Sequence, residues 1–287
     1  MRVDYFGKSD KGQVRKGNED YFAIEKLGDD EFLFVVADGM GGHQAGDVAS
    51  KLGTLTFVKY YKKFRKAACG IRESMDRALE QANGVILKKA TDDPQKRGMG
   101  TTFSAVVLAD MKAHLVHVGD SRVYLVRDEK IVKLTSDHTF VGKLVEEGRI
   151  TEDEARGHPQ KNILYMSLGA REAFEPETND GLDIREGDIF AMCSDGLSNM
   201  VTDTTIKEYI QSFNARKATE ELIDLANANG GTDNITLLVF RVNPNHQGSK
   251  TEPLFIVPPH HGFFTFLKDL FSGSAKKQPP TIDEEDK

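Results

Sequence analysis

Three aspartates that lie far apart in the chain each stand beside an apolar run. Asp38 lies in FLFVVADGMGG, Asp195 in DIFAMCSDGLSN and Asp233 in GGTDNITLLVFRV. If these runs are strands of one core, their ends gather three carboxylates in one pocket, where two charges ~4 Å apart repel by about 4 kcal/mol at an effective dielectric of ~20. That repulsion predicts a bound cation. The sequence has no His/Cys cluster that would favour zinc or copper, so oxygen ligands indicate a hard divalent ion such as Mg²⁺ or Mn²⁺.

Each aspartate taken alone has a simpler explanation. Asp-Gly and Asp-Asn are ordinary hairpin-turn dipeptides, and they end strands without any chemistry. The occurrence of three such sites together with further acidic motifs favours the functional interpretation.

Further polar motifs follow one another along the chain. RKGNED contains Arg15, Glu19 and Asp20, GTTFSAVVLAD contains Thr101 and Thr102, and HVGDSRVYLV contains Asp120 and Arg122. A single motif such as GDSR recurs by chance in many proteins, whereas the whole ordered series from RKGNED to TDN is hard to reproduce accidentally. Over residues 1–242 this series resembles the metal-dependent type 2C (PPM) serine/threonine protein phosphatases, particularly the compact bacterial members.

Short β-rich runs and longer amphipathic stretches must position these motifs. Strands are predicted at 32–37, 103–109, 113–118, 123–126, 131–134, 189–192 and 235–242, and helices at 45–66, 71–90, 203–211 and 215–228. Strands and helices segregate along the chain, which favours a layered α+β domain over a doubly wound one. The resemblance implies an α/β/β/α sandwich of two antiparallel sheets flanked by helices, and this element order accommodates it.

The resemblance also implies which residues hold metal ions. Asp38 would bridge two Mn²⁺ or Mg²⁺ ions, and Asp195 and Asp233 would complete one of the two sites. Glu19 and the backbone carbonyl of Gly39 would form the other site, because glycine lets the backbone approach an ion closely.

Three more residues receive roles from the resemblance. Asp120 would bind a weaker third ion, and Asp20 would orient water from behind the ligands. Arg15 would bind the phosphate through directed, charge-assisted hydrogen bonds, with an ordinary surface arginine as the alternative. Water activated by the two ions would then attack the phosphorus of a phosphoserine or phosphothreonine in line, without a covalent enzyme intermediate.

The proton donor to the leaving group stays open. His43 and His138 are candidates by residue type only. Met40 stands where some eukaryotic relatives carry a histidine after the Asp-Gly pair, so the role of that histidine does not transfer.

Residues 135–170 resemble the mobile flap of bacterial members, with short helical pieces between strand regions. Such inserted segments near active sites commonly contribute to substrate selection. Tyr165 and Met166 stand where relatives often have Thr and Arg, so the flap contacts to a phosphopeptide differ here.

Composition limits the class of protein. With 287 residues, 39% hydrophobic and 29% charged, the chain is expected to form one soluble globular domain plus a tail. A net charge of −7 without a dense basic cluster argues against a nucleic-acid partner. Cys69 and Cys193 are widely separated, so no disulfide framework is expected. No signal peptide and no run near the ~20 apolar residues of a membrane span occur, and a cytoplasmic location is therefore expected.

The predicted organisation has three parts. Residues 1–242 form the phosphatase catalytic domain, 243–262 a Pro/Gly-rich linker, and 263–287 a short amphipathic stretch followed by an acidic disordered tail. The apolar stripe at 263–271 is a candidate contact with a partner or a membrane surface, and packing on its own domain is the alternative.

The sequence therefore predicts hydrolysis of phosphoserine and phosphothreonine in protein substrates, opposing a cognate bacterial serine/threonine kinase. The alternative is a catalytically weak, metal-binding module that docks phosphoproteins on the same fold. A nucleotide or small-molecule phosphohydrolase would use the same ions, but the sequence contains no GxxxxGK[ST] loop.

Overall fold

Two antiparallel sheets lie at the centre of the computed structural model, which describes residues 1–41 and 45–243. The first sheet has the order β1 (Arg2–Asp10), β11 (Ile235–Asn243), β10 (Ile189–Cys193), β7 (Arg122–Arg127) and β8 (Lys130–Lys133). The second has the order β2 (Asp20–Lys26), β3 (Phe32–Met40), β5 (Phe103–Ala109), β6 (Lys112–Val118) and β9 (Glu177–Asp183), and the short β4 (Gly100–Thr101) pairs with the end of β3. Neighbouring strands run antiparallel throughout both sheets.

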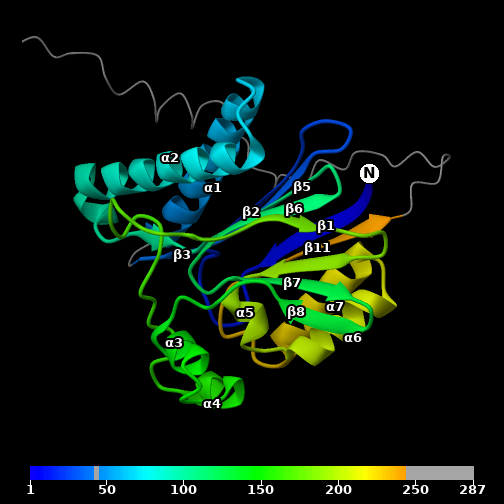
Figure 1. Cartoon of the computed structure of the whole chain (residues 1–287). Helices are drawn as coiled ribbons and strands as arrows, with labels where there is room; N and C mark the ends of the chain where they lie inside the picture. Colours follow the sequence, from blue (N-terminus) through cyan, green and yellow to red (C-terminus); the bar gives the residue numbers. More distant parts are fainter. Residues whose placement is uncertain (42–44, 244–287) are drawn as a thin grey trace, which may run out of the picture. The chain divides into compact units, whose positions relative to one another are not determined.

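Helices cover the outer face of each sheet (Figure 1). α1 (Ala45–Lys66) packs on β2 and β3 of the second sheet, and α2 (Ile71–Asp92) packs on α1. On the first sheet, α7 (Ala215–Ala228) packs on β1 and β11, and α6 (Asp203–Ser212) lies beside α7. This order of layers confirms the α/β/β/α sandwich expected from the sequence.

The core between the sheets is built around stacked aromatic rings. Phe34 of β3 stacks on Phe240 of β11 with ring centroids 3.8 Å apart, and Phe190 of β10 stacks on Phe240 at 5.1 Å. All three rings are fully buried. β5 is buried along its whole length, so its sequence FSAVVLA is apolar at every position except Ser104 rather than alternating.

The helices form where the sequence has an apolar stripe and a capping residue. In α7 the buried positions include Ala218, Leu222 and Ala226, which recur at the spacing of one helix face. The side chain of Asn214 precedes the helix and accepts a hydrogen bond from the backbone N–H of Lys217 at 2.9 Å, which fixes where the helix begins.

Four strands were not expected from the sequence, the two-residue β4 and the edge strands β1, β2 and β9. The sequences of β1, β2 and β9, which are RVDYFGKSD, DYFAIEK and ETNDGLD, lack a continuous apolar run. An edge strand pairs through backbone groups on one side only, so it needs fewer apolar side chains than a central strand. β9 is the extreme case, because its side chains are all exposed or half-buried.

Residues 135–170, which we call the flap segment, contain two short helices, α3 (Phe140–Glu146) and α4 (Glu152–Gly157). Thr139 and Thr151 cap these helices through their side-chain oxygens. The start of the segment is joined to the sandwich by the ion pair of Asp137 with Arg122 of β7, and its end by the bridge between Leu168 and Thr101. A further bridge, between Thr139 and Leu164, closes the segment on itself.

Strand β11 ends at Asn243, and the expected linker beyond it and the amphipathic tail at 263–287 lie outside the described residues. No helix in the described part of the chain combines the length and apolarity needed to cross a membrane.

Candidate metal centre and active site

The predicted ligands lie at strand ends from both sheets. Asp38 is near the end of β3, opposite Asp20 at the start of β2. Asp195 begins the short helix α5 (Asp195–Ser198) just after β10, and Asp233 lies just before β11. Because β10 and β11 are neighbours in the first sheet, Asp195 and Asp233 come to the same end of it.

One cleft of about 380 Å³ collects nearly all of the predicted site residues. Its lining includes Arg15, Glu19, Asp38, Gly39, Asp120, Asp195 and Asp233. Asp20 does not line the cleft, and its side chain is buried behind the wall at 7% exposure. The structure thus brings together residues that are separated by more than two hundred positions in the chain.

The buried carboxyl groups of this cleft favour their protonated forms in the absence of a cation. Burial raises the pKa of Asp38 well above its usual range, and the charges of Asp20 and Asp195 raise it further. Burial also raises the pKa of Asp120 well above its usual range, and the charge of Asp195 raises it further. For Asp195, burial and the charge of Asp233 raise the pKa to about 6. A bound divalent cation would replace these protons, as oxygen-ligand sites require.

Two carboxylate oxygens near the cleft have no hydrogen-bond partner among the described residues. Oδ1 of Asp195 and Oδ1 of Asp20 are both buried. Oδ2 of Asp20 accepts hydrogen bonds from the hydroxyls of Ser194 and Thr236, each at 2.7 Å. Burial raises the pKa of Asp20 to about 7, although these two hydroxyls oppose the shift. Unpartnered buried oxygens beside a cleft fit a place for a cation and its water.

Glycine is required where the backbone closes around the site. A Cβ on Gly39 would lie 2.0 Å from the carbonyl oxygen of Gly46 and 2.6 Å from that of Glu19. The N–H of Gly39 donates to the Glu19 carbonyl at 3.0 Å. This close approach holds the Glu19 backbone against the end of β3, so both parts of the second predicted metal site share one rigid contact.

Arg15 lies at the mouth of the cleft with a half-exposed side chain. Its Nη2 donates to Oδ2 of Asp233 at 2.8 Å. Partial burial would lower the pKa of Arg15, but the hydrogen bond and charge of Asp233 outweigh it and raise the pKa. Arg15 is therefore a permanent positive charge beside the carboxylates.

The protein phosphatase 2C family model matches residues 11–228, three quarters of the chain. The chain belongs to the protein phosphatase 2C family. It is 39% identical over 251 residues to the serine/threonine protein phosphatase PstP of Mycobacterium tuberculosis, an alignment that covers 87% of this chain and 47% of that relative. The chain thus spans about half the length of PstP. It is 34% identical over 244 residues to the serine/threonine phosphatase stp of Listeria monocytogenes, with 84% of this chain and 96% of the relative covered.

Solved structures agree with the family assignment. A crystal structure of PstP from Mycobacterium tuberculosis has a TM-score of 0.76 and 38% identity, covering 84% of this chain and 99% of that chain. The catalytic domain of PstP in complex with two manganese ions has a TM-score of 0.74 and 37% identity, with the same coverage.

Several residues of this phosphatase 2C site were not singled out from the sequence. Oδ1 of Asn234 accepts from the Glu19 N–H at 2.8 Å, and its Nδ2 donates to the carbonyls of Lys11 and Gly17, each at 2.9 Å. Asn234 therefore fastens the RKGNED segment to the start of β11. The TDN motif could have indicated this role, because the side-chain amide of Asn234 can both donate and accept hydrogen bonds.

The GTT motif fixes the backbone of Asp38. Oγ1 of Thr102 accepts from the Asp38 N–H at 2.9 Å, and the Thr102 N–H donates to the Asp38 carbonyl at 2.9 Å. Oγ1 of Thr101 donates to the same carbonyl at 2.9 Å. These contacts leave the Asp38 carboxylate as the part of the residue available to a ligand.

The structure does not place His138 at the cleft as a proton donor, and His43 lies outside the described residues. His138 is buried, and its ring Nδ1 accepts a hydrogen bond from the Gly119 N–H at 3.1 Å. The backbone N–H of His138 donates to the Gly119 carbonyl at 2.8 Å. His138 therefore braces the turn that carries Asp120. Its neighbour His117 bonds Ser104 through Nδ1 and two carbonyls through Nε2, so neither nitrogen is available to a metal ion.

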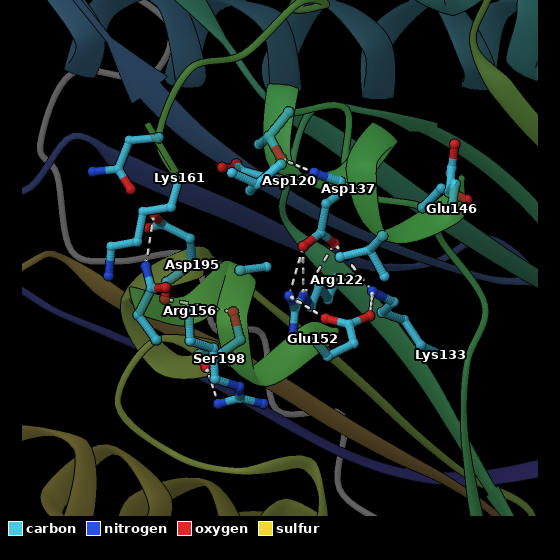
Figure 2. A pocket seen from close by; sticks show the side chains of 18 residues that line it. Asp120, Arg122, Lys133, Asp137, Glu146, Glu152, Arg156, Lys161, Asp195 and Ser198 are labelled. Carbon is cyan, nitrogen blue, oxygen red and sulfur yellow. Dashed lines mark hydrogen bonds and ion pairs between the residues drawn. The ribbon is translucent and has the colours of Figure 1, made fainter. Parts of the chain in front are cut away.

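The flap segment forms one wall of the cleft through Asn162 and Leu164. A smaller cavity of about 170 Å³ lies next to the cleft, beneath α3 and α4, and Asp120 and Asp195 line both. Figure 2 shows the charged side chains that surround the smaller cavity, with dashed contacts between the flap segment and the sandwich.

Proposed function

We propose that this chain hydrolyses phosphoserine and phosphothreonine in proteins and that Mn²⁺ or Mg²⁺ ions, two per site, are its cofactors. The observation that carries the proposal is the convergence of five acidic side chains of a protein phosphatase 2C chain in one cleft, with an arginine at its mouth. The structure of a relative with two manganese ions supports the choice of ion class and number.

We assign the ligands as follows. Asp38 would contribute to both ion sites, Asp195 and Asp233 would complete one of them, and Glu19 and the Gly39 carbonyl would complete the other. Asp120, which lines the same cleft, holds a weaker third ion. When bound, the ions supply a Lewis acid for the phosphoryl oxygens and lower the pKa of water towards neutrality.

The remaining roles belong to Arg15 and Asp20. Arg15 binds phosphate oxygens at the mouth of the cleft, where its guanidinium offsets the charge of the carboxylates and of the ester. Asp20 holds a proton or orients water through Oδ1, because Ser194 and Thr236 occupy Oδ2. The raised pKa of Asp20, about 7, suits a group that exchanges protons near neutral pH.

We further propose that residues 1–242 are the catalytic domain, that the substrates are phosphoproteins in the cytoplasm, and that the enzyme opposes a cognate serine/threonine kinase. The names of the relatives, serine/threonine protein phosphatase PstP and protein phosphatase PhpP, support protein substrates. The docking-module alternative is not favoured, because every predicted ligand is present and the ligands converge.

A substrate panel tests the proposal. The full chain would be given p-nitrophenyl phosphate, a phosphothreonine peptide or ATP, each with and without Mn²⁺, and the panel repeated with Asp38→Ala. Asp29→Ala is the matched control, because Asp29 is an exposed aspartate that does not line the cleft. We expect Mn²⁺-dependent turnover of the peptide that Asp38→Ala abolishes and Asp29→Ala keeps. Peptide binding without turnover would instead establish the docking module.

A further inference from the structure

The flap segment is held to the sandwich midway along its length, in addition to its pinned ends. Helix α4 makes this connection at both of its termini (Figure 2). At the start of α4, Oε1 of Glu152 accepts from Nζ of Lys133 at 2.8 Å, and Lys133 lies on β8. Near the end of α4, Arg156 reaches two different elements of the sandwich.

The contacts of Arg156 lead directly to the proposed metal site. Its Nη1 donates to the carbonyl oxygen of Ser198 at 3.1 Å, and its Nη2 lies 3.4 Å from Oδ1 of Asp203. Ser198 is the last residue of α5, the four-residue helix that Asp195 begins. The carbonyls at the end of so short a helix lack helical partners, and a cation is favourable there.

The second partner of Arg156 is itself fixed. Oδ1 of Asp203 also accepts from the hydroxyl of Tyr124 at 3.1 Å, and Tyr124 is a fully buried residue of β7. Arg122, on the same strand, makes a bidentate contact with Asp137 at the start of the flap segment. Arg156 therefore joins α4 to a rigid part of the sandwich, and the joint includes α5.

From this geometry we propose that Arg156 is a positioning residue, which fixes the flap segment against α5 and so couples the flap wall of the cleft to the Asp195 ligand. The chain passes from α4 to Asn162 and Leu164 within a few residues, and these two form the flap wall. A fixed α4 thus fixes the wall that faces a substrate. Both couplings rest on the proposed function, the coupling of wall to substrate on protein substrates and the coupling of flap to metal on Asp195 as a ligand.

Coupling between two sites is reciprocal. If metal binding orders α5, it must also hold the flap segment through Arg156, and a released flap segment must weaken metal binding. A small substrate that contacts only the ions and Arg15 should be insensitive to the flap wall, whereas a phosphopeptide should respond to it.

Arg156→Ala removes both contacts, and Arg149→Ala is the matched control. Arg149 is an exposed arginine of the same segment, and its side chain pairs with Glu147 within that segment at 3.3 Å. Arg156→Lys retains a positive charge for the Ser198 carbonyl but lacks the planar fork that reaches Asp203 as well, so an intermediate effect is expected. Thermal unfolding establishes that each variant is folded.

Limited proteolysis gives a readout that does not depend on activity. In the parent chain we expect Mn²⁺, compared with EDTA, to slow cleavage within residues 135–170 by about tenfold or more, whereas in Arg156→Ala this protection falls below about twofold. Kinetics give the second readout. In Arg156→Ala we expect KM for a phosphothreonine peptide to rise about five- to tenfold, whereas KM for p-nitrophenyl phosphate stays within about twofold of the parent value. The Mn²⁺ concentration for half-activation of this variant should rise about threefold.

Two results would overturn the proposal. One is Mn²⁺ protection in Arg156→Ala equal to that in Arg149→Ala. The other is an equal loss of turnover for both substrates with an unchanged Mn²⁺ requirement, which indicates a general structural defect. If Arg156→Ala does not fold, the same comparisons with Arg156→Lys decide. A parent chain that hydrolyses p-nitrophenyl phosphate but no phosphopeptide would refute protein substrates, and the proteolysis result would still decide the coupling.

Discussion

Asp20 and Asp38 face each other across the antiparallel pair of β2 and β3, the first at the start of its strand and the second near the end of its partner. Asp38 lines the cleft, whereas Asp20 is buried behind it and bonded to two hydroxyls from the first sheet. The pair therefore presents one carboxylate to the cleft and holds the other behind it.

Replacement of Asp20 should slow the reaction without removing the metal. We expect Asp20→Asn to lower kcat for p-nitrophenyl phosphate by about 10²-fold, because the amide cannot exchange a proton, while Mn²⁺ affinity changes by less than about tenfold. Steady-state kinetics and calorimetric Mn²⁺ titration measure the two effects. Ser194→Ala, which removes one hydroxyl from Oδ2, should give a smaller loss of kcat. Loss of Mn²⁺ binding in Asp20→Asn would make Asp20 a ligand instead.

The metal-free protein should lose stability as pH rises. Asp195 and Asp20 have pKa values of about 6 and about 7 in the folded chain, above the ordinary value of 3.8. A raised folded pKa stabilises the fold below the unfolded pKa, and this contribution disappears as pH rises through the folded value. In EDTA we therefore expect the free energy of unfolding to be lower at pH 8 than at pH 5, by on the order of 1–3 kcal/mol.

Urea unfolding at the two pH values checks this expectation, and saturating Mn²⁺ should remove most of the deficit at pH 8. Asp38→Asn should reduce the pH dependence, since it removes a carboxyl group whose own pKa is raised, first by burial and then by the charges of Asp20 and Asp195. Equal stability in EDTA at both pH values would show that the pKa values of Asp195 and Asp20 are not raised in the folded chain.

The backbone contact at Gly39 should not tolerate a methyl group. A Cβ there would lie 2.0 Å from the Gly46 carbonyl oxygen, whereas nothing lies within 4 Å of a Cβ built on Gly17. We expect Gly39→Ala to lower the free energy of unfolding by about 1–3 kcal/mol. It should also raise the Mn²⁺ requirement, because Glu19 is displaced. Chemical denaturation and Mn²⁺ titration measure these effects, and Gly17→Ala should stay within about 0.5 kcal/mol of the parent. Equal stability and an equal Mn²⁺ requirement of Gly39→Ala and Gly17→Ala would contradict the close backbone contact at Gly39.

Residues beyond the last strand should be dispensable for catalysis. A chain that ends at Asn243 retains β11 and every residue that lines the cleft. We expect its kcat and KM for a phosphothreonine peptide, and its melting temperature, to match those of the full chain. Sedimentation of both chains would reveal any contribution of the tail to self-association. A loss of activity in the shorter chain would move the domain boundary beyond residue 243.

The central strands and long helices were predictable because their apolar periodicity is strong. Strands β1, β2 and β9 were not, since backbone pairing with a neighbour defines these edge strands rather than their own side chains. The edge strand β8 was predicted, because it contains the β-branched pair Ile131 and Val132. Likewise Asp38, Asp195 and Asp233 could be found as acidic residues after apolar runs. The hydroxyls of Ser194 and Thr236 could not, because contacts across the two sheets give them their role.

The contact between Arg156 and α5 could not be predicted from the sequence either. Arginine in a short polar helix is most often a surface residue, and Ser198 contributes only a backbone carbonyl, which no residue type reveals. Contacts of this kind depend on the path of the chain between elements, so they emerge only when the flap segment is placed in space.

The proposed cation ligands come from both halves of the sandwich. Asp38 and Glu19 come from the side of β2 and β3, and Asp195 and Asp233 from the side of β10 and β11. An ion bound by these residues would join the two layers, in addition to their apolar contacts and the hydrogen bonds of Asp20 and Glu19 between them. A displacement of one layer relative to the other would move these residues apart, so a change that loosens the packing of the two layers should also lower activity.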